Sequence, residues 1–213
     1  MNKNDLAADL ICVIAFAILL IMTFIAISKH LRQSYEINTG FFCALMCLAP
    51  LALRRGKAFR LPLALVVMIE VSIFLHAYGV LLKEYDLINN WDTVTHTVSS
   101  ITVSLCTFYA LMTAAVFDPR IKFTRSWMPF FIFFIAVTFG AYWESFEFAV
   151  DNLWGTKMQY SPFDTFGDLM CDVLGGVVVA IYSYIYLGRR TEKDFIEELN
   201  IHPRLRKIVK SRG

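Results

Sequence analysis

Apolar residues run in six long stretches along this chain, and short polar segments separate the stretches. A helix needs about 20 mostly apolar residues to cross the ~30 Å hydrocarbon core of a bilayer. The pattern therefore predicts an all-α, polytopic integral membrane protein. We expect its six transmembrane helices at residues 6–28, 37–53, 62–82, 92–117, 127–151 and 164–187.

The first and second stretches differ from the others. The first is too long for the apolar region of a signal peptide and lacks a small-x-small cleavage site, which favours a retained helix. The second is the shortest and contains Pro50. We expect residues 1–187 to form a single transmembrane domain and residues 188–213 to form a basic cytoplasmic tail.

Composition agrees with the membrane interpretation. A chain with 57% hydrophobic residues and 19 Phe is no ordinary soluble domain. All five cysteines fall in apolar stretches, and their odd number and spacing indicate neither a disulfide framework nor a structural zinc motif. The sequence has no nucleotide loop, nucleophile elbow or nucleic-acid module, so membrane lipids, and not nucleic acids, are the expected partners.

The basic residues predict the orientation. Six spans place both termini on one side of the membrane. If that side is the cytoplasm, the outer connections hold only four of the 20 Lys and Arg, namely Lys29, Arg32, Lys83 and Lys157. The positive-inside rule then predicts an inner (plasma) membrane protein with cytoplasmic N- and C-termini.

Ionisable residues interrupt the outer ends of four spans. At 1.5 Å per residue, five of them lie roughly 6–12 Å inside the outer boundary, with His76 at about the same level: His96, Glu144, Glu147, Asp168 and Asp172. Glu144 and Glu147 are three residues apart, which keeps both side chains on one helix face, and Asp92 and His96 are one turn apart. The predicted ligand set is Asp92, His96, Glu144, Glu147, Asp164, Asp168 and Asp172, with His76 as a candidate further ligand.

Other interpretations of the same residues remain open. Asp92 and Asp164, each followed by Thr at the start of a span, are also suited to helix N-capping. The buried set can form a protonated, hydrogen-bonded network, and His76 can be a packed interfacial histidine. Glu70 lies deep in the third span, six residues from His76, and faces away from the cluster. Beside the aspartates runs the small-residue stripe Gly167, Cys171, Gly175, which favours close helix packing.

A bound divalent cation would offset the negative charge of these carboxylates, because a charge inside the membrane is costly without a partner. Carboxylates with one or two imidazoles suit Mg²⁺, Mn²⁺, Ca²⁺, Fe²⁺ or Zn²⁺. Two such metals can activate water and clamp phosphate oxygens. At the outer headgroup level, the site would meet a lipid or isoprenoid phosphate.

Three motifs give a resemblance to a known family. They are Trp91-Asp92-x-x-x-His96, Tyr142-Trp143-Glu144-x-x-Glu147, and Asp164-Thr165-x-x-Asp168 followed by Leu174-Gly175. In these, the chain resembles the YjdF-type family of uncharacterised bacterial and archaeal inner-membrane proteins, over about residues 62–187. The resemblance implies the fold and the acidic cluster and leaves the chemistry open.

Three functions follow as expectations. The first is a metal-dependent hydrolase or transferase acting on a phosphate-bearing lipid at the outer leaflet. The second is a cation or proton transporter that uses the same acidic cluster. The third is a non-catalytic metal-binding or assembly protein of the membrane.

The predicted topology is directly testable. A cysteine introduced at Asn89 is expected to react with a membrane-impermeant thiol reagent added to intact cells, and a cysteine at Lys57 is not. Mass tagging of the purified protein measures both reactions. Labelling at Lys57 would overturn the orientation, and with it an outward-facing site.

Overall fold

The computed structural model describes residues 3–29, 34–55, 61–118, 120–122 and 124–199. These residues form helices and no strand, and six helical segments are long and apolar enough to cross a membrane. The all-α prediction is thereby confirmed, and each predicted span matches a helical segment to within three residues at either end. Residues 200–213 of the predicted tail lie outside the described residues, as do Arg32, Lys57 and Arg60.

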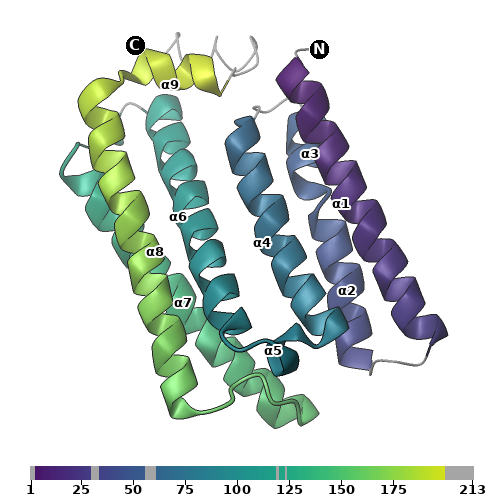
Figure 1. The fold of residues 1–213 in the computed structure, drawn as a ribbon. Helices are drawn as coiled ribbons and strands as arrows, with labels where there is room; N and C mark the ends of the chain where they lie inside the picture. Colours follow the sequence, from purple (N-terminus) through teal and green to yellow (C-terminus); the bar gives the residue numbers. More distant parts are fainter. Residues whose placement is uncertain (1–2, 30–33, 56–60, 119, 123, 200–213) are drawn as a thin grey trace. The chain divides into compact units, whose positions relative to one another are not determined.

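The helices belong to two compact units: the first contains the described residues up to Trp91 and those from Ile196 on, and the second runs from Asp92 to Phe195. The first contains α1 (Lys3–Ser28), α2 (Ser34–Met46), α3 (Ala49–Arg55), α4 (Leu63–Leu82) and α5 (Glu84–Leu87). The second contains most of α6 (Trp91–Phe117), then α7 (Trp127–Trp154), α8 (Pro162–Arg189) and the start of α9 (Glu192–Glu198) (Figure 1). A single domain over residues 1–187 stays a prediction.

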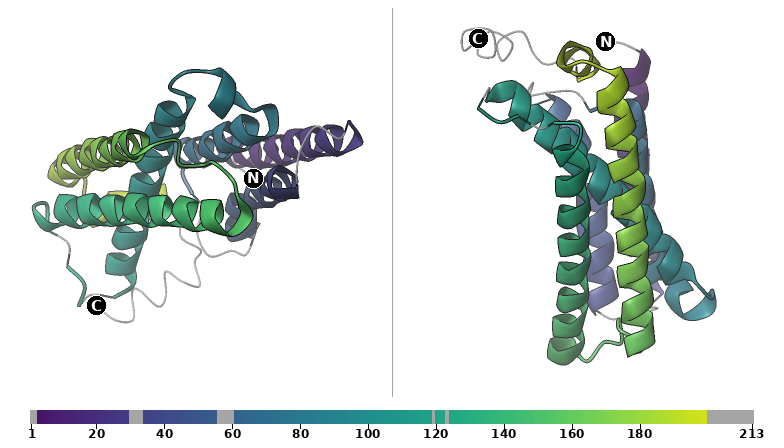
Figure 2. Two further views of the ribbon diagram at one scale, coloured as in Figure 1. Left: turned by 90° about the horizontal axis from the view of Figure 1, so that it is seen from below. Right: turned by 90° about the vertical axis from the view of Figure 1, so that its left-hand side faces the viewer.

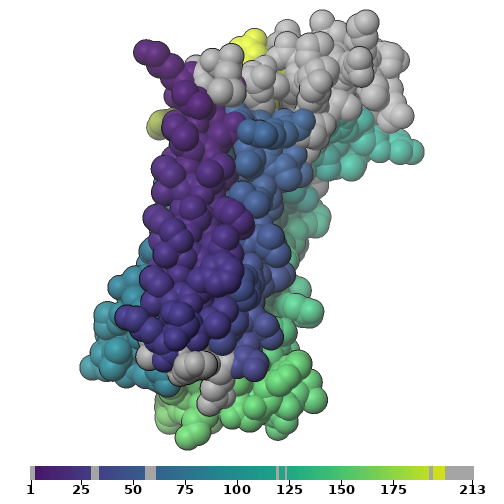
Figure 3. Space-filling model, turned by 90° about the vertical axis from the view of Figure 1, so that its right-hand side faces the viewer, coloured from purple at the N-terminus to yellow at the C-terminus, as the bar shows by residue number. Residues whose placement is uncertain are grey.

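In the first unit, α1 packs along both α2 and α4. Figure 3 shows α1 lying alongside α2 and α3 on one face. The core between these helices is built mainly from small side chains, including Cys43, Ala44 and Ala77. Arg54 ties α3 to the start of α1, because it donates to the Asp5 carbonyl (2.7 Å) and pairs with the Asp9 carboxylate.

The second predicted span is not one continuous helix. It consists of α2 and α3, with a turn at Cys47 and Leu48 between them. Pro50 has no N–H to offer to the carbonyl of Met46, and its ring clashes with a straight helix, so the helix breaks just before it. Leu48 N–H instead bonds the carbonyl of Leu45 at 3.0 Å, which tightens the last turn.

In the second unit, α7 and α8 are antiparallel neighbours joined by residues 155–161 (Figure 2). Glycines set how closely the helices approach. A Cβ on Gly140 of α7 would lie 2.8 Å from Cβ of Asp172, and one on Gly176 of α8 would lie 2.9 Å from Cβ of Ala136. Gly175, on the predicted small-residue stripe, backs onto Ser100 of α6, but Gly167 on the same stripe faces open space.

An aromatic cluster packs α6, α8 and α9 together at the end of the unit where α9 follows α8. Phe108 of α6 is fully buried, and four rings surround its own with centroids 5.2–6.2 Å away: Tyr109, Tyr182, Tyr186 and Phe195. Edge-to-face aromatic pairs add roughly 0.5–1.5 kcal/mol beyond burial. Phe195 thereby anchors the short helix α9 to α6.

Large apolar side chains remain exposed along the long helices. In α7, for example, Phe134, Phe139 and Phe148 are each more than half exposed. A soluble protein rarely presents such continuous apolar surface, whereas lipid chains cover it without cost. The exposure agrees with the six membrane-spanning segments.

Close packing of α7 on α8 generates a stability prediction. We expect Gly140→Ala to lower the free energy of unfolding by about 1–3 kcal/mol, because the new methyl group overlaps Asp172. Gly167→Ala is the matched control, since no atom lies within 4 Å of its added Cβ and alanine favours the helix. Unfolding in detergent measures both, and equal stability of the two variants would contradict the packing.

Candidate metal centre

The predicted ligand residues of the second unit lie toward one end of three helices. Asp92 and His96 belong to the first two turns of α6, and Asp168 and Asp172 to the second and third turns of α8. Glu144 lies ten residues before the end of α7. At 1.5 Å per residue, these side chains start within about 15 Å of the Trp91, Pro162 and Trp154 helix ends.

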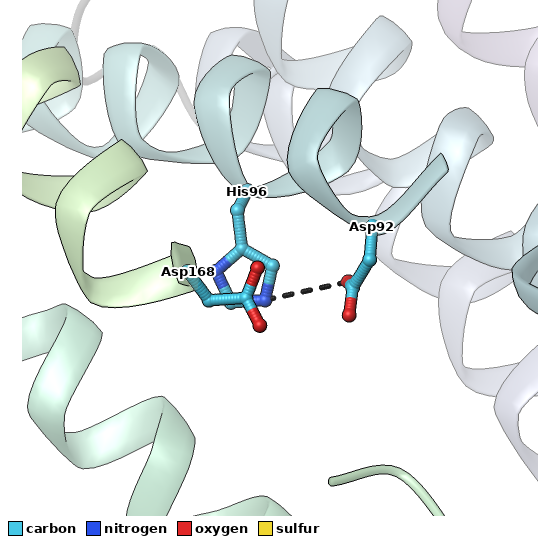
Figure 4. Close-up of side chains that lie close together, drawn as sticks. All are labelled: Asp92, His96 and Asp168. Atoms are coloured by element: carbon cyan, nitrogen blue, oxygen red, sulfur yellow. Dashed lines mark ion pairs between the residues drawn. The ribbon is translucent and has the colours of Figure 1, made fainter. Parts of the chain in front are cut away.

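Three of these residues have the spacing of a metal site. Asp92, His96 and Asp168 each offer a ligand atom, and the three atoms all lie within 4.8 Å of one another. Figure 4 shows the Asp92 and Asp168 carboxylates gathered around the His96 ring. His96 and Asp168 are buried, and Asp92 is partly exposed. A cation at the centre of such a group replaces three unfavourable burials by ligand bonds.

The two nitrogens of His96 face different carboxylates. Nε2 lies 3.5 Å from Asp92 Oδ1 and 4.0 Å from Glu144 Oε1, whereas Nδ1 lies 3.6 Å from Asp172 Oδ1. A metal-bound histidine commonly directs its second nitrogen at a carboxylate, which fixes the ring and its tautomer. Asp172 is in place to do this while Nε2 faces the acidic group.

In both Asp172 and Glu144, one carboxylate oxygen accepts a hydrogen bond and the other has no donor among the described residues. Asp172 Oδ1 accepts a hydrogen bond from the Ser100 hydroxyl, and Glu144 Oε2 accepts one from the Gln159 amide at 3.1 Å. Asp172 Oδ2 and Glu144 Oε1 are buried and have no hydrogen-bond partner among the described residues. An unpaired buried acceptor costs about 1–3 kcal/mol. Glu144 Oε1, which lies 4.0 Å from His96 Nε2, is therefore available as a ligand atom.

Glu147 and Asp164 have local partners. Glu147 is buried and accepts a hydrogen bond from the Trp143 indole at 2.8 Å. Asp164 lies in the first turn of α8, where Ser161 accepts from its N–H (3.2 Å) and its own carboxylate accepts from Tyr160 N–H (3.2 Å). The N-cap of α8 is therefore Ser161, so the prediction that Asp164 is the N-cap is wrong, although its carboxylate helps to cap the same helix start. Asp92, by contrast, lies inside α6 and does not precede it.

His76 lies in the first unit, on α4. Its Nδ1 is 3.0 Å from the Tyr85 hydroxyl, and its ring meets that of Tyr85 edge-on. These contacts suit the packed interfacial histidine. Its role as a further ligand stays a prediction, as does the metal-ligand role of the other seven residues.

Comparison with known families identifies the chain. A family model described as "Predicted membrane protein (DUF2238)" matches residues 10–189. The chain belongs to this family. It is the YjdF-type family that the sequence motifs indicate, and the match extends through the first unit as well. Neither a curated protein nor a solved structure matches the chain.

Sequence reasoning missed the residues that support the acidic groups in this DUF2238 member. Gln159 lies in the loop between α7 and α8, and its amide also donates to the Glu144 carbonyl at 3.0 Å. The loop is held by Asp151, whose carboxylate accepts from Thr156 Oγ1 and from the N–H groups of Met158 and Gln159. No motif marks this loop, and only its polar composition next to Glu144 and Glu147 gave a signal.

Ser100 provides a test of the support around His96 in this family member. We expect Ser100→Ala to lower the free energy of unfolding by about 1–3 kcal/mol, because it removes the hydroxyl donor to the buried Asp172 carboxylate. Ser145→Ala is the matched control, since the exposed Ser145 hydroxyl bonds only the carbonyl of Ala141 in its own helix. Thermal unfolding in detergent compares the two, and a neutral Ser100→Ala would count against the Asp172 arrangement.

Proposed function

We propose that this chain is an inner-membrane protein that binds a divalent cation among α6, α7 and α8 and uses it on a phosphate-bearing lipid. The observation that carries the proposal is the group of Asp92, His96 and Asp168, whose ligand atoms lie within 4.8 Å of one another. The proposed reaction is hydrolysis of the phosphate ester or transfer of its phosphate-bearing group.

The ligand chemistry supports a hard or borderline divalent ion. Carboxylate oxygens with one imidazole nitrogen suit Mg²⁺, Mn²⁺, Ca²⁺, Fe²⁺ or Zn²⁺. Asp92, Asp168 and His96 Nε2 would hold the ion, and Glu144 Oε1, which no described residue hydrogen-bonds, would complete the set. Asp172 and Ser100 would orient His96 from behind.

The depth of the group supports a lipid-headgroup substrate. His96 and Asp168 begin about 8–9 Å from the ends of α6 and α8, which is near the headgroup level of a membrane-spanning helix. A divalent ion there would polarise a phosphate oxygen and lower the pKa of bound water. With cytoplasmic termini, as the distribution of Lys and Arg favours, this end of the helices faces the outer leaflet.

One observation favours transport as a second candidate. Asp164, Asp168 and Asp172 follow each other at one-turn intervals along α8, so acidic groups continue inward from the helix end. Acidic residues along a path inside a membrane bundle mark ion and proton routes. A cation or proton transporter would use this series and Glu144 as successive binding positions.

Metal binding should make folding metal-dependent. A ligand that binds only the native state stabilises it by RT ln(1 + [L]/Kd), which is about 2.7 kcal/mol at a ligand concentration ~100-fold above Kd. Chelator is therefore expected to lower the melting temperature of the purified wild-type protein, and Asp168→Asn is expected to abolish this response. Differential scanning fluorimetry in detergent, with elemental analysis of the same samples, measures both.

The matched control is Asp118→Asn. It is the same chemical change, made just after the end of α6 that lies far from Asp92 and His96. Asp118 pairs with the exposed Arg120, so its loss should change stability little and leave the chelator response intact. No chelator effect on the wild-type protein would overturn the metal site. If metal binds, phosphate release from lipid phosphates supports the enzyme, and cation flux into liposomes without such release supports the transporter.

A further inference from the structure

Arg125 is held in one position at the end of the second unit where α7 begins and α8 ends. It is exposed and lies just before Trp127, the first residue of α7. Its Cζ atom lies 3.9 Å from the centroid of the Tyr184 ring, and its Nε donates a hydrogen bond to the Tyr184 carbonyl at 3.1 Å. An arginine that stacks on an aromatic face and donates to a carbonyl has less freedom than an ordinary surface arginine.

Gly188 makes the space on α8 that this guanidinium occupies. A Cβ atom at Gly188 would lie 2.7 Å from Cζ of Arg125 and 2.9 Å from one of its terminal nitrogens, so a methyl group there would displace the guanidinium. Tyr184 and Gly188 are one turn apart and therefore share a face of α8. The ring, the carbonyl and the glycine together form the surface on which the guanidinium rests.

The two terminal nitrogens of Arg125 can serve an acceptor outside the protein. Nε is already used on α8, and no described carboxylate forms an ion pair with this side chain. Asp118, in the same connection, pairs instead with Arg120 at 2.7 Å. A guanidinium with two parallel donors matches the oxygens of a phosphate group. Arg189, the last residue of α8, is also exposed and adds positive charge at this end.

An exposed apolar face of α8 leads to the same position. Val177, Ile181 and Tyr184 are all exposed, and their spacing of four and three residues places them on one face of the helix. α8 is long and apolar enough to cross a membrane, so lipid chains would cover this face, and the guanidinium lies against the ring at its end. The phosphate of a lipid whose chain lies along Val177 and Ile181 would therefore be at the level of Arg125.

We propose that Arg125, held by Tyr184 and Gly188, binds the phosphate group of an anionic phospholipid. Its two terminal nitrogens donate to the phosphate oxygens, and the lipid chain lies along the exposed face of α8. Basic sites at the cytoplasmic ends of membrane helices bind anionic headgroups, and the distribution of Lys and Arg places this end at the inner leaflet. The site is separate from the α6–α8 centre, because Gly188 lies about 30 Å along α8 from Asp168.

Native mass spectrometry of the full-length protein in detergent tests the site by titration with phosphatidylglycerol and with phosphatidylcholine. Chelator is present throughout, so that a metal ion at the α6–α8 centre does not contribute. We expect tighter binding of phosphatidylglycerol, because the choline cation of the other lipid neutralises its own phosphate. Arg125→Gln should weaken phosphatidylglycerol binding about fivefold, the usual contribution of one basic residue near an anionic headgroup. Arg120→Gln, the same change at a residue paired with Asp118, is the matched control and should keep wild-type affinity.

Gly188→Ala is the sharper variant, because it displaces the Arg125 guanidinium and changes no charge. We expect it to weaken phosphatidylglycerol binding as much as Arg125→Gln does. Gly167→Ala is the matched control, since no atom lies within 4 Å of its added Cβ, and it should keep wild-type affinity. Alanine favours a helix over glycine, and the atoms that Gly188→Ala meets are the end of a flexible side chain, so the fold should survive. Size-exclusion elution as wild type verifies this.

Four outcomes would overturn the site. The first is equal affinity of the wild-type protein for the two lipids, and the second is wild-type affinity in Arg125→Gln or Gly188→Ala. The third is an equal loss in Arg120→Gln, which would indicate attraction to the whole basic surface. The fourth is displacement of the lipid by an equal concentration of inorganic phosphate at constant ionic strength, which would identify a free anion as the ligand. Asp168→Asn should bind phosphatidylglycerol as wild type does, so failure of the α6–α8 metal centre is distinguishable from failure of this site.

Discussion

Carboxylates buried inside an apolar helix bundle are the constraint on which the second unit depends. Glu144, Glu147, Asp168 and Asp172 are each at least 94% buried, and water is not there to solvate them. The protein compensates part of this cost with single donors, namely the Ser100 hydroxyl, the Gln159 amide and the Trp143 indole. Of the oxygens left without a donor among the described residues, Glu144 Oε1 faces His96 Nε2, whereas Asp172 Oδ2 does not face the imidazole. A cation is the simplest complement to what remains.

Helix packing and loop structure serve this arrangement together. Gly140 has no side chain, so the Asp172 carboxylate fits against α7, and Gly175 likewise makes room for Ser100. The loop from Gly155 to Ser161 closes the same end of the unit: Asp151 holds it, and Gln159 reaches from it to Glu144. A change in this loop therefore acts on the buried acids, although the loop itself lies outside the spans.

Much of the fold was predictable from sequence, because hydropathy and the 1.5 Å rise of a helix determine the spans and the depth of each residue. The sequence placed His96 and Asp168 at one depth and Asp92 one turn from His96, and in the structure ligand atoms of the three lie within 4.8 Å of one another. The residues that support the acidic groups could not be predicted in this way. Gln159 acts through a loop conformation, and Gly140 through a contact with another helix, and neither has a periodic signal. Glu70 is buried without a hydrogen-bond partner among the described residues, and its separation from the acidic cluster stays a prediction.

The break between α2 and α3 also affects how the chain enters a membrane. At 1.5 Å per residue, α2 is about 20 Å long and α3 about 10 Å, so neither alone spans a ~30 Å hydrocarbon core. During synthesis, α2 cannot leave the insertion machinery for lipid as a finished helix, because its exposed end would carry unsatisfied carbonyl groups. It has to wait for α3, and for a partner that covers the turn. α1 is already made at that point and packs against both halves, so the first three helices are best understood as a single unit of insertion.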